Sequence, residues 1–199
     1  MIFLTTLEND FPNECELINS FFENGLDVLH INKPDKNYMQ LMAYISAIDE
    51  VYHSKIVVHQ HHDLAEDFVL NGIYVQPESR LNLGEDFGLY VSNFTNQSYD
   101  VSTTFNSTDE ALLYKETPLK YSFIAMSEIK RATAQGFKVK EVVNLPMSFI
   151  ATEGINVIGI GLIQKMGFDG INLCNEIWKN TNPLSLFKLM KKEVDLHFK

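Results

Sequence analysis

The chain has 199 residues, of which 45% are hydrophobic and 21% are charged, and its formal net charge is −10 at pH 7. This composition excludes a disordered chain, and the length suits one well-buried domain, which we expect to span residues 1–199. The excess of negative charge repels nucleic acid and anionic lipid, so we expect neither as a partner.

The first half of the chain alternates short apolar runs with segments whose apolar residues recur at helical spacing. This alternation is typical of parallel β/α units. The first predicted helix ends at Gly25, and the third ends at Asn71 and Gly72. We expect strands at residues 2–6, 27–32, 55–59 and 73–76, and helices that begin near Pro12, at a cap on Asp35 and at a cap on Asp63.

The second half is less regular at two places. Residues 77–98 predict a loop with one extended piece at 88–94, and residues 127–145 fit a helix or a strand. Elsewhere we expect strands at 101–105, 121–126, 148–152 and 170–174, and helices that open at a capping box on Ser107, at Val157 and at Asn182–Pro183.

Eight strands with helices between them predict an α/β fold, namely a (β/α)8 TIM-type barrel in one compact domain. A doubly wound open sheet has the same alternation of elements and is the competing arrangement. Periodicity alone does not separate the two.

Five stretches together resemble the thiamine phosphate synthase/TenI family. Residues 27–34 resemble its second-strand motif, residues 56–65 and 71–75 its third-strand and fourth-strand signature, and residues 153–156 and 166–171 its phosphate loop and the following turn. The resemblance runs in matching order over residues 1–178. It implies a barrel that joins an aminopyrimidine diphosphate to a thiazole phosphate, with Mg²⁺ and basic residues that neutralise the leaving pyrophosphate. TenI-type relatives bind thiazole phosphates, and some are tautomerases.

Several positions depart from the residues that this resemblance implies for the diphosphate and the metal. The second-strand Gln-x-Arg is replaced by His30 and Asn32, although Lys33 follows, and asparagine cannot replace an arginine fork. The Mg²⁺-binding aspartate after the third strand is Gln60, and a second acidic ligand aligns with Ser79. Because Mg²⁺ prefers anionic oxygen, we expect the family's Mg²⁺ site to be lost.

The phosphate loop and the tautomerase position also depart from the family. Glu153 stands in place of the first glycine of a Gly-Gly pair, so that only Gly154 remains for a backbone approach to phosphate. Asn106 occupies the place of the tautomerase histidine and cannot exchange protons near neutral pH. We therefore expect thiamine phosphate synthase activity to be weak or absent.

The remaining polar residues near the predicted carboxyl ends of the strands define a candidate site. Acid–base chemistry would fall to His30, His59 and Glu153. An alternative is a metal site formed by His30, His59 and His61, although no zinc signature supports it. Lys33 and Arg80 are interpreted as solvated charges that could hold a residual anion. The predicted ligand-binding residues are Asn32, Lys33, Tyr74, Thr104, Asn106 and Gly154.

The cysteines and the amino-terminal residues indicate a reducing compartment. Cys15 and Cys174 form no C-x-x-C pair, the amino-terminal residues lack a basic region and turn acidic by Glu8, and no apolar run reaches the ~20 residues of a membrane helix. We therefore expect a cytoplasmic protein.

Three functional hypotheses follow from the sequence. The first is a divergent ligand-binding barrel of thiamine metabolism, the second an active transferase or TenI-like isomerase, and the third a non-enzymatic interaction protein. The cofactor is left unknown. The partners left open are a small heteroaromatic or phosphorylated ligand and a second copy of the chain.

Overall fold

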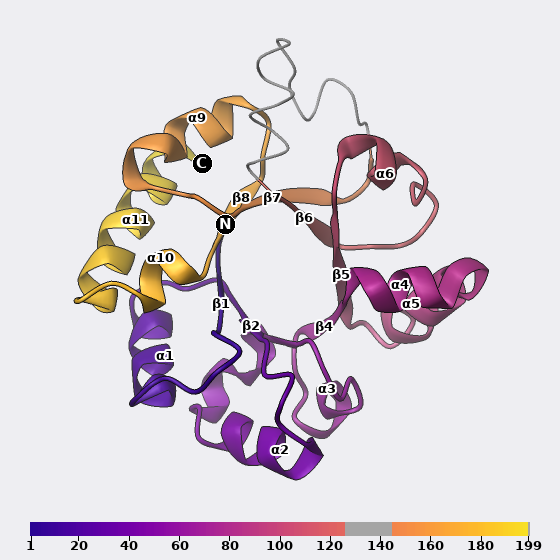
Figure 1. Ribbon diagram of the computed structural model, residues 1–199, viewed down its shortest axis with the longest axis horizontal. Coiled ribbons are helices and arrows are strands. Elements are labelled where there is room, and N and C mark those ends of the chain that lie inside the picture. The colour runs from indigo at the N-terminus through magenta and orange to yellow at the C-terminus, as the bar shows by residue number, and fades with distance from the viewer. Residues whose placement is uncertain (126–144, 199) are drawn as a thin grey trace.

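Eight parallel strands close into a barrel in the computed structural model, which describes residues 1–125 and 145–198 (Figure 1). Each strand pairs with the next along the chain, and β1 pairs with β8 to complete the ring. The TIM-type prediction is therefore confirmed, and the open doubly wound sheet is excluded. The strands are β1 (Ile2–Thr5), β2 (Val28–Ile31), β3 (Ile56–Val58), β4 (Gly72–Val75), β5 (Asp100–Phe105), β6 (Tyr121–Ala125), β7 (Ser148–Thr152) and β8 (Gly170–Leu173).

Helices surround the barrel in Figure 1 and cover its outer face. Their apolar residues pack with the outward side chains of the strands into one large core. The helices are α1 (Glu14–Glu23), α2 (Tyr38–Ser46), α3 (Leu64–Asp67), α4 (Pro77–Leu83), α5 (Phe87–Thr95), α6 (Thr108–Leu112), α9 (Ile160–Lys165), α10 (Asn175–Trp178) and α11 (Pro183–His197), with short 3-10 helices η1 (Glu50–Lys55), η2 (Gly84–Asp86) and η3 (Val157–Gly159).

The prediction for residues 77–98 is wrong. This segment contains α4, η2 and α5, and no extended piece lies at 88–94. Phe87 and Val91 are four residues apart and are both buried, which is the spacing of one helix face. The three helical pieces have 7, 3 and 9 residues, and such short helices hide the helical period in the sequence.

One predicted helix cap is also wrong. Asn37, and not Asp35, caps α2, and its side chain forms a capping box with Gln40. Asp63 is the N-cap residue of α3 as expected, but its side chain makes no capping hydrogen bond. Ser107 does accept from the Glu110 backbone N–H as expected. The prediction for residues 127–145 falls almost wholly outside the described residues.

Alternation along the strands fills the barrel interior with a second, smaller cluster. It is mainly aromatic, and its members lie on β1, β3, β4, β6 and β7. Its buried residues are Phe3, Val57, Tyr74, Tyr121, Phe123 and Ile150. The buried imidazole of His30 contacts this cluster from β2, with 4.9 Å between its ring centre and that of Phe123.

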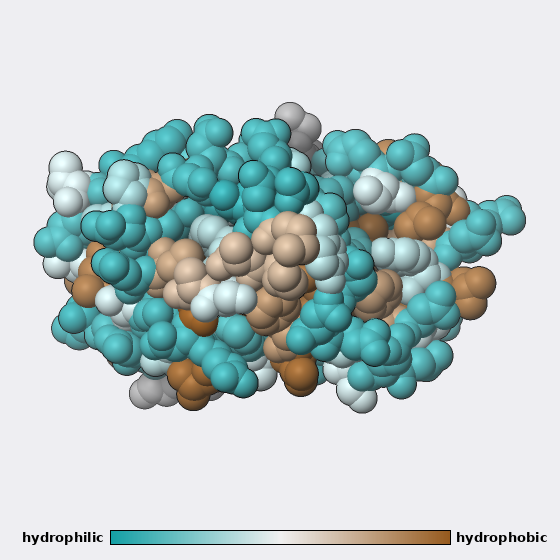
Figure 2. Space-filling model, turned by 90° about the horizontal axis from the view of Figure 1, so that it is seen from below, coloured by the Kyte–Doolittle hydropathy of each residue, from teal (hydrophilic) through white to brown (hydrophobic). Residues whose placement is uncertain are grey.

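One face of the molecule is mostly hydrophilic. Figure 2 views the molecule from below Figure 1 and shows a hydrophilic face crossed by a central band of apolar residues. Helix α2 lies at that edge of Figure 1, and its Met39 is 64% exposed. Within the described residues, no helix is both long and apolar enough to cross a membrane.

Candidate ligand site at the barrel mouth

The carboxyl ends of all eight strands lie at one end of the barrel, which we call the mouth. Uncharged polar side chains gather there on opposite sides. Asn172 accepts a hydrogen bond from Thr5 at 3.0 Å and donates one to Thr152 at 3.2 Å. Across the barrel, the Gln60 amide donates to Asn32 at 2.9 Å.

Two histidines form the centre of the site. His30 on β2 and His59, directly after β3, lie with His30 Nδ1 2.9 Å from His59 Nε2. The predicted pairing of these residues is thus realised, because they come from neighbouring parallel strands. His30 Nε2 lies 2.7 Å from the Tyr121 hydroxyl on β6, and the Gln76 amide nitrogen lies 3.5 Å from His59 Nδ1. Gln76 and Tyr121 were not among the predicted site residues.

Burial keeps both imidazoles uncharged. Desolvation lowers the pKa of His30 to about 3, because no solvent and no carboxylate stabilises its protonated form. Desolvation also lowers the pKa of His59 well below its ordinary value, and the neighbouring His30 and His62 lower it further. The pair therefore offers neutral hydrogen-bonding groups and no positive charge near neutral pH.

Tyr74 forms one wall beside His59. The two rings stack with 4.1 Å between their centres, and the Tyr74 hydroxyl lies 2.7 Å from Thr104 Oγ1 on β5. Burial raises the pKa of Tyr74 to about 12, so the phenol stays protonated. The predicted ligand residues Tyr74 and Thr104 thus contact each other next to the histidine pair.

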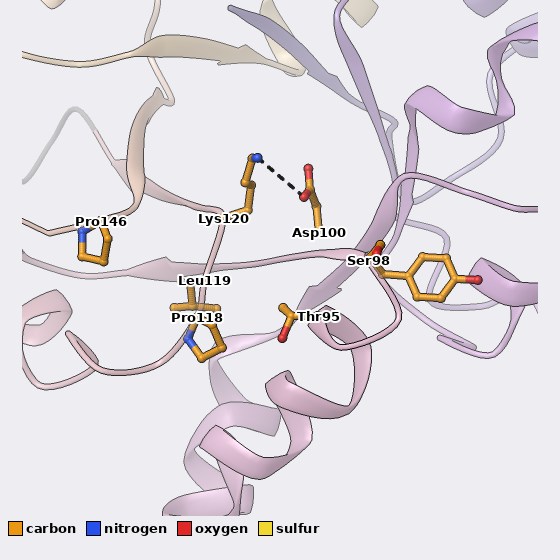
Figure 3. Close-up of a pocket in the computed structure, with 8 residues that line it drawn as sticks. Thr95, Ser98, Asp100, Pro118, Leu119, Lys120 and Pro146 are labelled. Atoms are coloured by element: carbon orange, nitrogen blue, oxygen red, sulfur yellow. Dashed lines mark ion pairs between the residues drawn. The ribbon is translucent and has the colours of Figure 1, made fainter.

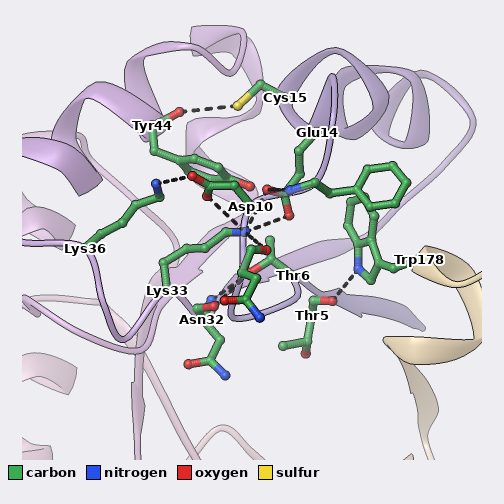
Figure 4. A network of polar contacts seen from close by, with 12 residues as sticks. Thr5, Thr6, Asp10, Glu14, Cys15, Asn32, Lys33, Lys36, Tyr44 and Trp178 are labelled. Atoms are coloured by element: carbon green, nitrogen blue, oxygen red, sulfur yellow. Dashed lines mark hydrogen bonds and ion pairs between the residues drawn. The ribbon is translucent and has the colours of Figure 1, made fainter.

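Lys33 is not the solvated charge that the sequence suggested. Its side chain is fully buried, and its ammonium donates to both carboxylate oxygens of Glu14, at 2.7 and 3.0 Å, and to the Asn9 carbonyl (Figure 4). The Asp10 carboxylate lies 3.6 Å away and also binds Lys36. Lys33 therefore links the β1–α1 loop to the end of β2, and its charge is already balanced within the protein.

Arg80 is also buried, against expectation. Its guanidinium donates to the Thr104 carbonyl at 2.7 Å and to Thr103 Oγ1 at 3.2 Å, and it pairs with Glu110 of α6. Glu110 in turn accepts from the backbone and side-chain N–H groups of Asn106. The two cations that were expected to hold a residual anion are thus bound to carboxylates of the chain itself.

The Mg²⁺ positions implied by the family resemblance do not fit a metal ion. The Gln60 side chain accepts from the Lys33 backbone N–H and donates to Asn32, so both of its polar atoms have protein partners. Ser79 is exposed on α4. Among the described residues, no group of three or more His, Cys, Asp and Glu side chains could hold a metal ion.

The alternative histidine metal site is not assembled. The strand ends at Val58, so His59 and His61 do not share a strand face as the prediction assumed. His61 is exposed, with a left-handed φ of 51°, and its Nε2 lies 3.3 Å from the Lys36 carbonyl. His62 is not a solvated loop residue, because its ring lies within 2.6 Å of the Tyr90 hydroxyl and 3.0 Å of the Tyr74 carbonyl.

Glu153 and Gly154 follow β7 in the turn where the phosphate loop was expected. Both have left-handed backbone conformations, with φ of 65° and 64°. Glycine adopts this conformation without strain, and glutamate does so only at a cost. Glu153 is exposed and is not hydrogen-bonded to His30 or His59 in the described contacts, so the predicted three-residue set is reduced to the two histidines.

A separate pocket lies at the opposite end of the barrel. Figure 3 shows it between the amino ends of β5 and β6, where Lys120 and Asp100 form an ion pair at 4.0 Å. Thr95 and Leu119 also line it. Because the strands of such barrels carry their sites at the carboxyl ends, this pocket is not the candidate site.

Comparisons with solved structures agree with the barrel fold. The thiamine phosphate pyrophosphorylase of Bacteroides thetaiotaomicron superposes with a TM-score of 0.75 at 26% identity, and the match covers 98% of each chain. The chain is similar to this pyrophosphorylase. The Pyrococcus furiosus thiamine phosphate pyrophosphorylase matches with a TM-score of 0.78 at 15% identity, over 100% of this chain and 96% of its own.

Other matches share only the fold. The 3-hexulose-6-phosphate synthase of Salmonella typhimurium has a TM-score of 0.68 at 12% identity, over 99% of this chain and all of its own. No protein-family model matches the chain, and no curated protein matches it by sequence. The similarity to the pyrophosphorylases therefore rests on the structural superpositions and on the 26% identity with the Bacteroides thetaiotaomicron protein.

Proposed function

We propose that this chain is a divergent relative of the thiamine phosphate synthases that binds a small uncharged heteroaromatic ligand at the mouth and makes thiamine phosphate slowly or not at all. The ligand would contact His59, Tyr74 and the amides of Asn32 and Asn106. The chain would share the barrel of the pyrophosphorylases and bind its ligand at the mouth, but it would not act on phosphate substrates.

The internal neutralisation of Lys33 and Arg80 carries this proposal. A diphosphate substrate needs cations that are free to pair with it. Here Glu14 holds the Lys33 ammonium at 2.7 Å, and Glu110 holds the Arg80 guanidinium. A phosphate that paired with Lys33 or Arg80 would have to displace a carboxylate from an existing pair and leave that carboxylate without its counter-charge.

The uncharged groups around His59 in the described part of the mouth support a heteroaromatic ligand. Neutral imidazole, amide and hydroxyl groups bind ring nitrogens and amino groups by single hydrogen bonds. The Tyr74 ring, stacked on His59, adds a flat apolar wall. A small-molecule site usually combines a few polar groups with apolar and aromatic walls.

A thermal-shift titration tests the proposal directly. We expect thiazole alcohol or aminopyrimidine alcohol to raise the melting temperature, because a ligand at 100 times its Kd stabilises the folded state by about 2.7 kcal/mol. The corresponding phosphates and pyrophosphate, with or without Mg²⁺, should give little shift. His59→Ala should abolish the response, and His61→Ala, at an exposed position, should preserve it.

A coupled assay for thiamine phosphate provides the opposing measurement. The 26% identity to the Bacteroides thetaiotaomicron pyrophosphorylase favours an active transferase as the second candidate function. Mg²⁺-dependent turnover at rates typical of enzymes, about 1 per second or more, would overturn the proposed loss of phosphate chemistry. If neither turnover nor any ligand response is found, the remaining hypothesis is a barrel that acts only through protein partners.

A further inference from the structure

The two histidines and Tyr121 form a hydrogen-bonded chain with only two proton arrangements. Each neutral imidazole carries one N–H, and a single proton lies between His30 Nδ1 and His59 Nε2. If His59 holds that proton, His30 must carry its own on Nε2 and donate to Tyr121. If His30 holds it, His30 Nε2 accepts from Tyr121, and His59 must carry its proton on Nδ1.

These two arrangements present opposite groups at the mouth. In the first, which we call the inward arrangement, His59 Nδ1 is an acceptor. In the second, the outward arrangement, His59 Nδ1 is a donor. The state of this nitrogen is therefore fixed by whether the Tyr121 hydroxyl, on the far side of His30, accepts or donates.

Contacts at both ends of the chain favour the inward arrangement. The Ser102 hydroxyl donates to the Ile73 carbonyl at 3.4 Å, and Ser102 is paired in register with Tyr121 on the neighbouring strand. With its proton directed to Ile73, the Ser102 oxygen stays available as an acceptor for Tyr121. At the mouth, the Gln76 amide nitrogen, a donor, lies 3.5 Å from His59 Nδ1. Every link then runs from Gln76 toward the interior, and such aligned bonds reinforce each other.

We infer that Tyr121 is a positioning residue that holds His59 in the Nε2–H tautomer, so that His59 Nδ1 accepts a hydrogen bond from an N–H group of the ligand. Gln76 occupies this acceptor among the described residues and would be displaced by the ligand. The tautomer belongs to the ligand-free protein, whereas the preference for an N–H ligand rests on the proposed function.

Removal of the Tyr121 hydroxyl should reverse the direction of the hydrogen bonds between the two histidines. In Tyr121→Phe, the inward arrangement leaves the buried His30 Nε2–H against an apolar ring with no acceptor. A buried donor without a partner is more strongly avoided than an unused lone pair, so the outward arrangement becomes favoured. His59 Nδ1 then changes from acceptor to donor, although no residue at the mouth has been altered.

The test is the ¹⁵N chemical shift of the imidazole nitrogens in the ligand-free protein near pH 7.5. We expect His30 and His59 to show a protonated Nε2 and an unprotonated Nδ1, and Tyr121→Phe to exchange these signals in both rings. Tyr74→Phe is the matched control. It removes a hydroxyl that bonds Thr104 and keeps the ring stacked on His59, so the tautomers should not change.

Three NMR results would overturn the inference. They are an unprotonated Nε2 on His59 in the unaltered protein, no exchange in a folded Tyr121→Phe variant, and the same exchange in Tyr74→Phe. Far-ultraviolet circular dichroism establishes that both variants are folded. Because these signals are read without ligand, the result does not depend on the proposed function.

Ligand selectivity extends the test to the mouth. An aminopyrimidine alcohol, which donates through its amino group, should lose about tenfold in affinity in Tyr121→Phe. A thiazole alcohol, whose ring nitrogen only accepts, should lose none or gain. Exchange of the tautomers without binding of either probe would uphold the role of Tyr121 and contradict the proposed function. Binding of both probes with unchanged selectivity would contradict the proposed contact at Nδ1.

Discussion

Stability at acid pH should depend on the two central histidines. The pKa of His30 is about 3 and that of His59 is also strongly lowered, whereas both titrate near pH 6.5 in the unfolded chain. Below about pH 6.5 the unfolded chain binds protons that the folded chain does not. The free energy of unfolding should therefore fall as the pH decreases toward 3, by about 1.4 kcal/mol per pH unit for each histidine.

Urea denaturation between pH 7 and pH 5 measures how the free energy of unfolding changes with pH. This pH range lies above the pKa values of most carboxylates. His59→Gln should make the slope shallower by about 1.4 kcal/mol per pH unit. His61→Gln, at an exposed position, should leave it unchanged. Equal slopes for the unaltered protein and His59→Gln would show that the histidine is not held neutral in the fold.

The Lys33–Glu14 pair should contribute more to stability than a surface pair. Glu14→Gln leaves an ammonium that is fully buried without its counter-charge, and we expect a loss of about 3 kcal/mol or more in the free energy of unfolding. Asp10→Asn is the control, because Asp10 is 65% exposed and its removal should cost less than about 1 kcal/mol. A double replacement, Glu14→Leu with Lys33→Met, should recover most of the loss. A cost for Glu14→Gln no larger than that for Asp10→Asn would contradict the buried pair.

At the residue scale, the sequence identified the histidines but not their partners. His30 and His59 end neighbouring strands, so their contact follows from parallel pairing. Tyr121 is 91 residues from His30, and the pattern of β6 indicates only a core tyrosine. The burial of Lys33 and Arg80 was missed for a similar reason, since the carboxylates that permit it come from other β/α units.

At the scale of elements, the strands were predicted better than the helices. The bounds of β7 were predicted without error, and no other strand end differs by more than one residue, because a buried parallel strand is a short apolar run. Helices α4 and α5 were missed, because residues 77–98 show no regular apolar period in the sequence. The structure uses Gly84 at a left-handed φ of 52° to separate two helices.

At Gly72, strands β4 and β5 approach each other closely. A Cβ atom at this position would lie 1.9 Å from the Asp100 backbone carbonyl oxygen, which neither strand can avoid without separating. Gly72→Ala should lower the free energy of unfolding by about 3 kcal/mol. Gly88→Ala is the matched control, because its Cβ would meet no atom within 4 Å and alanine favours the helix by up to about 1 kcal/mol. Thermal denaturation of both variants measures these changes. Equal changes in stability for the two variants would contradict the close approach of β4 and β5.

At the scale of the whole molecule, closure of the barrel can be followed with one probe. Trp178 is the single tryptophan, is 2% exposed and donates its indole N–H to the Thr5 carbonyl at 2.7 Å. It therefore joins α10, which follows β8, to the end of β1. Because a closed barrel shares its pairing around the ring, we expect tryptophan fluorescence and circular dichroism to report the same urea midpoint. A fluorescence change at lower urea would show that β1 and β8 separate first.

The assembly of the molecule stays a prediction at this scale. The apolar band in Figure 2 and the exposed Met39 leave a homodimer open. Analytical ultracentrifugation at micromolar concentration distinguishes one copy from two. A cytoplasmic location likewise stays an expectation from the cysteine pattern.

The two internal ion pairs also bear on how such a barrel can change over generations. A lineage that returned to phosphate substrates would have to release Lys33 from Glu14 and Arg80 from Glu110. Each carboxylate lost alone leaves an uncompensated buried cation before any substrate can bind, so the first step is selected against through folding. Under the proposed loss of phosphate chemistry, the loss can therefore proceed by single substitutions, whereas its reversal requires coordinated changes in several β/α units.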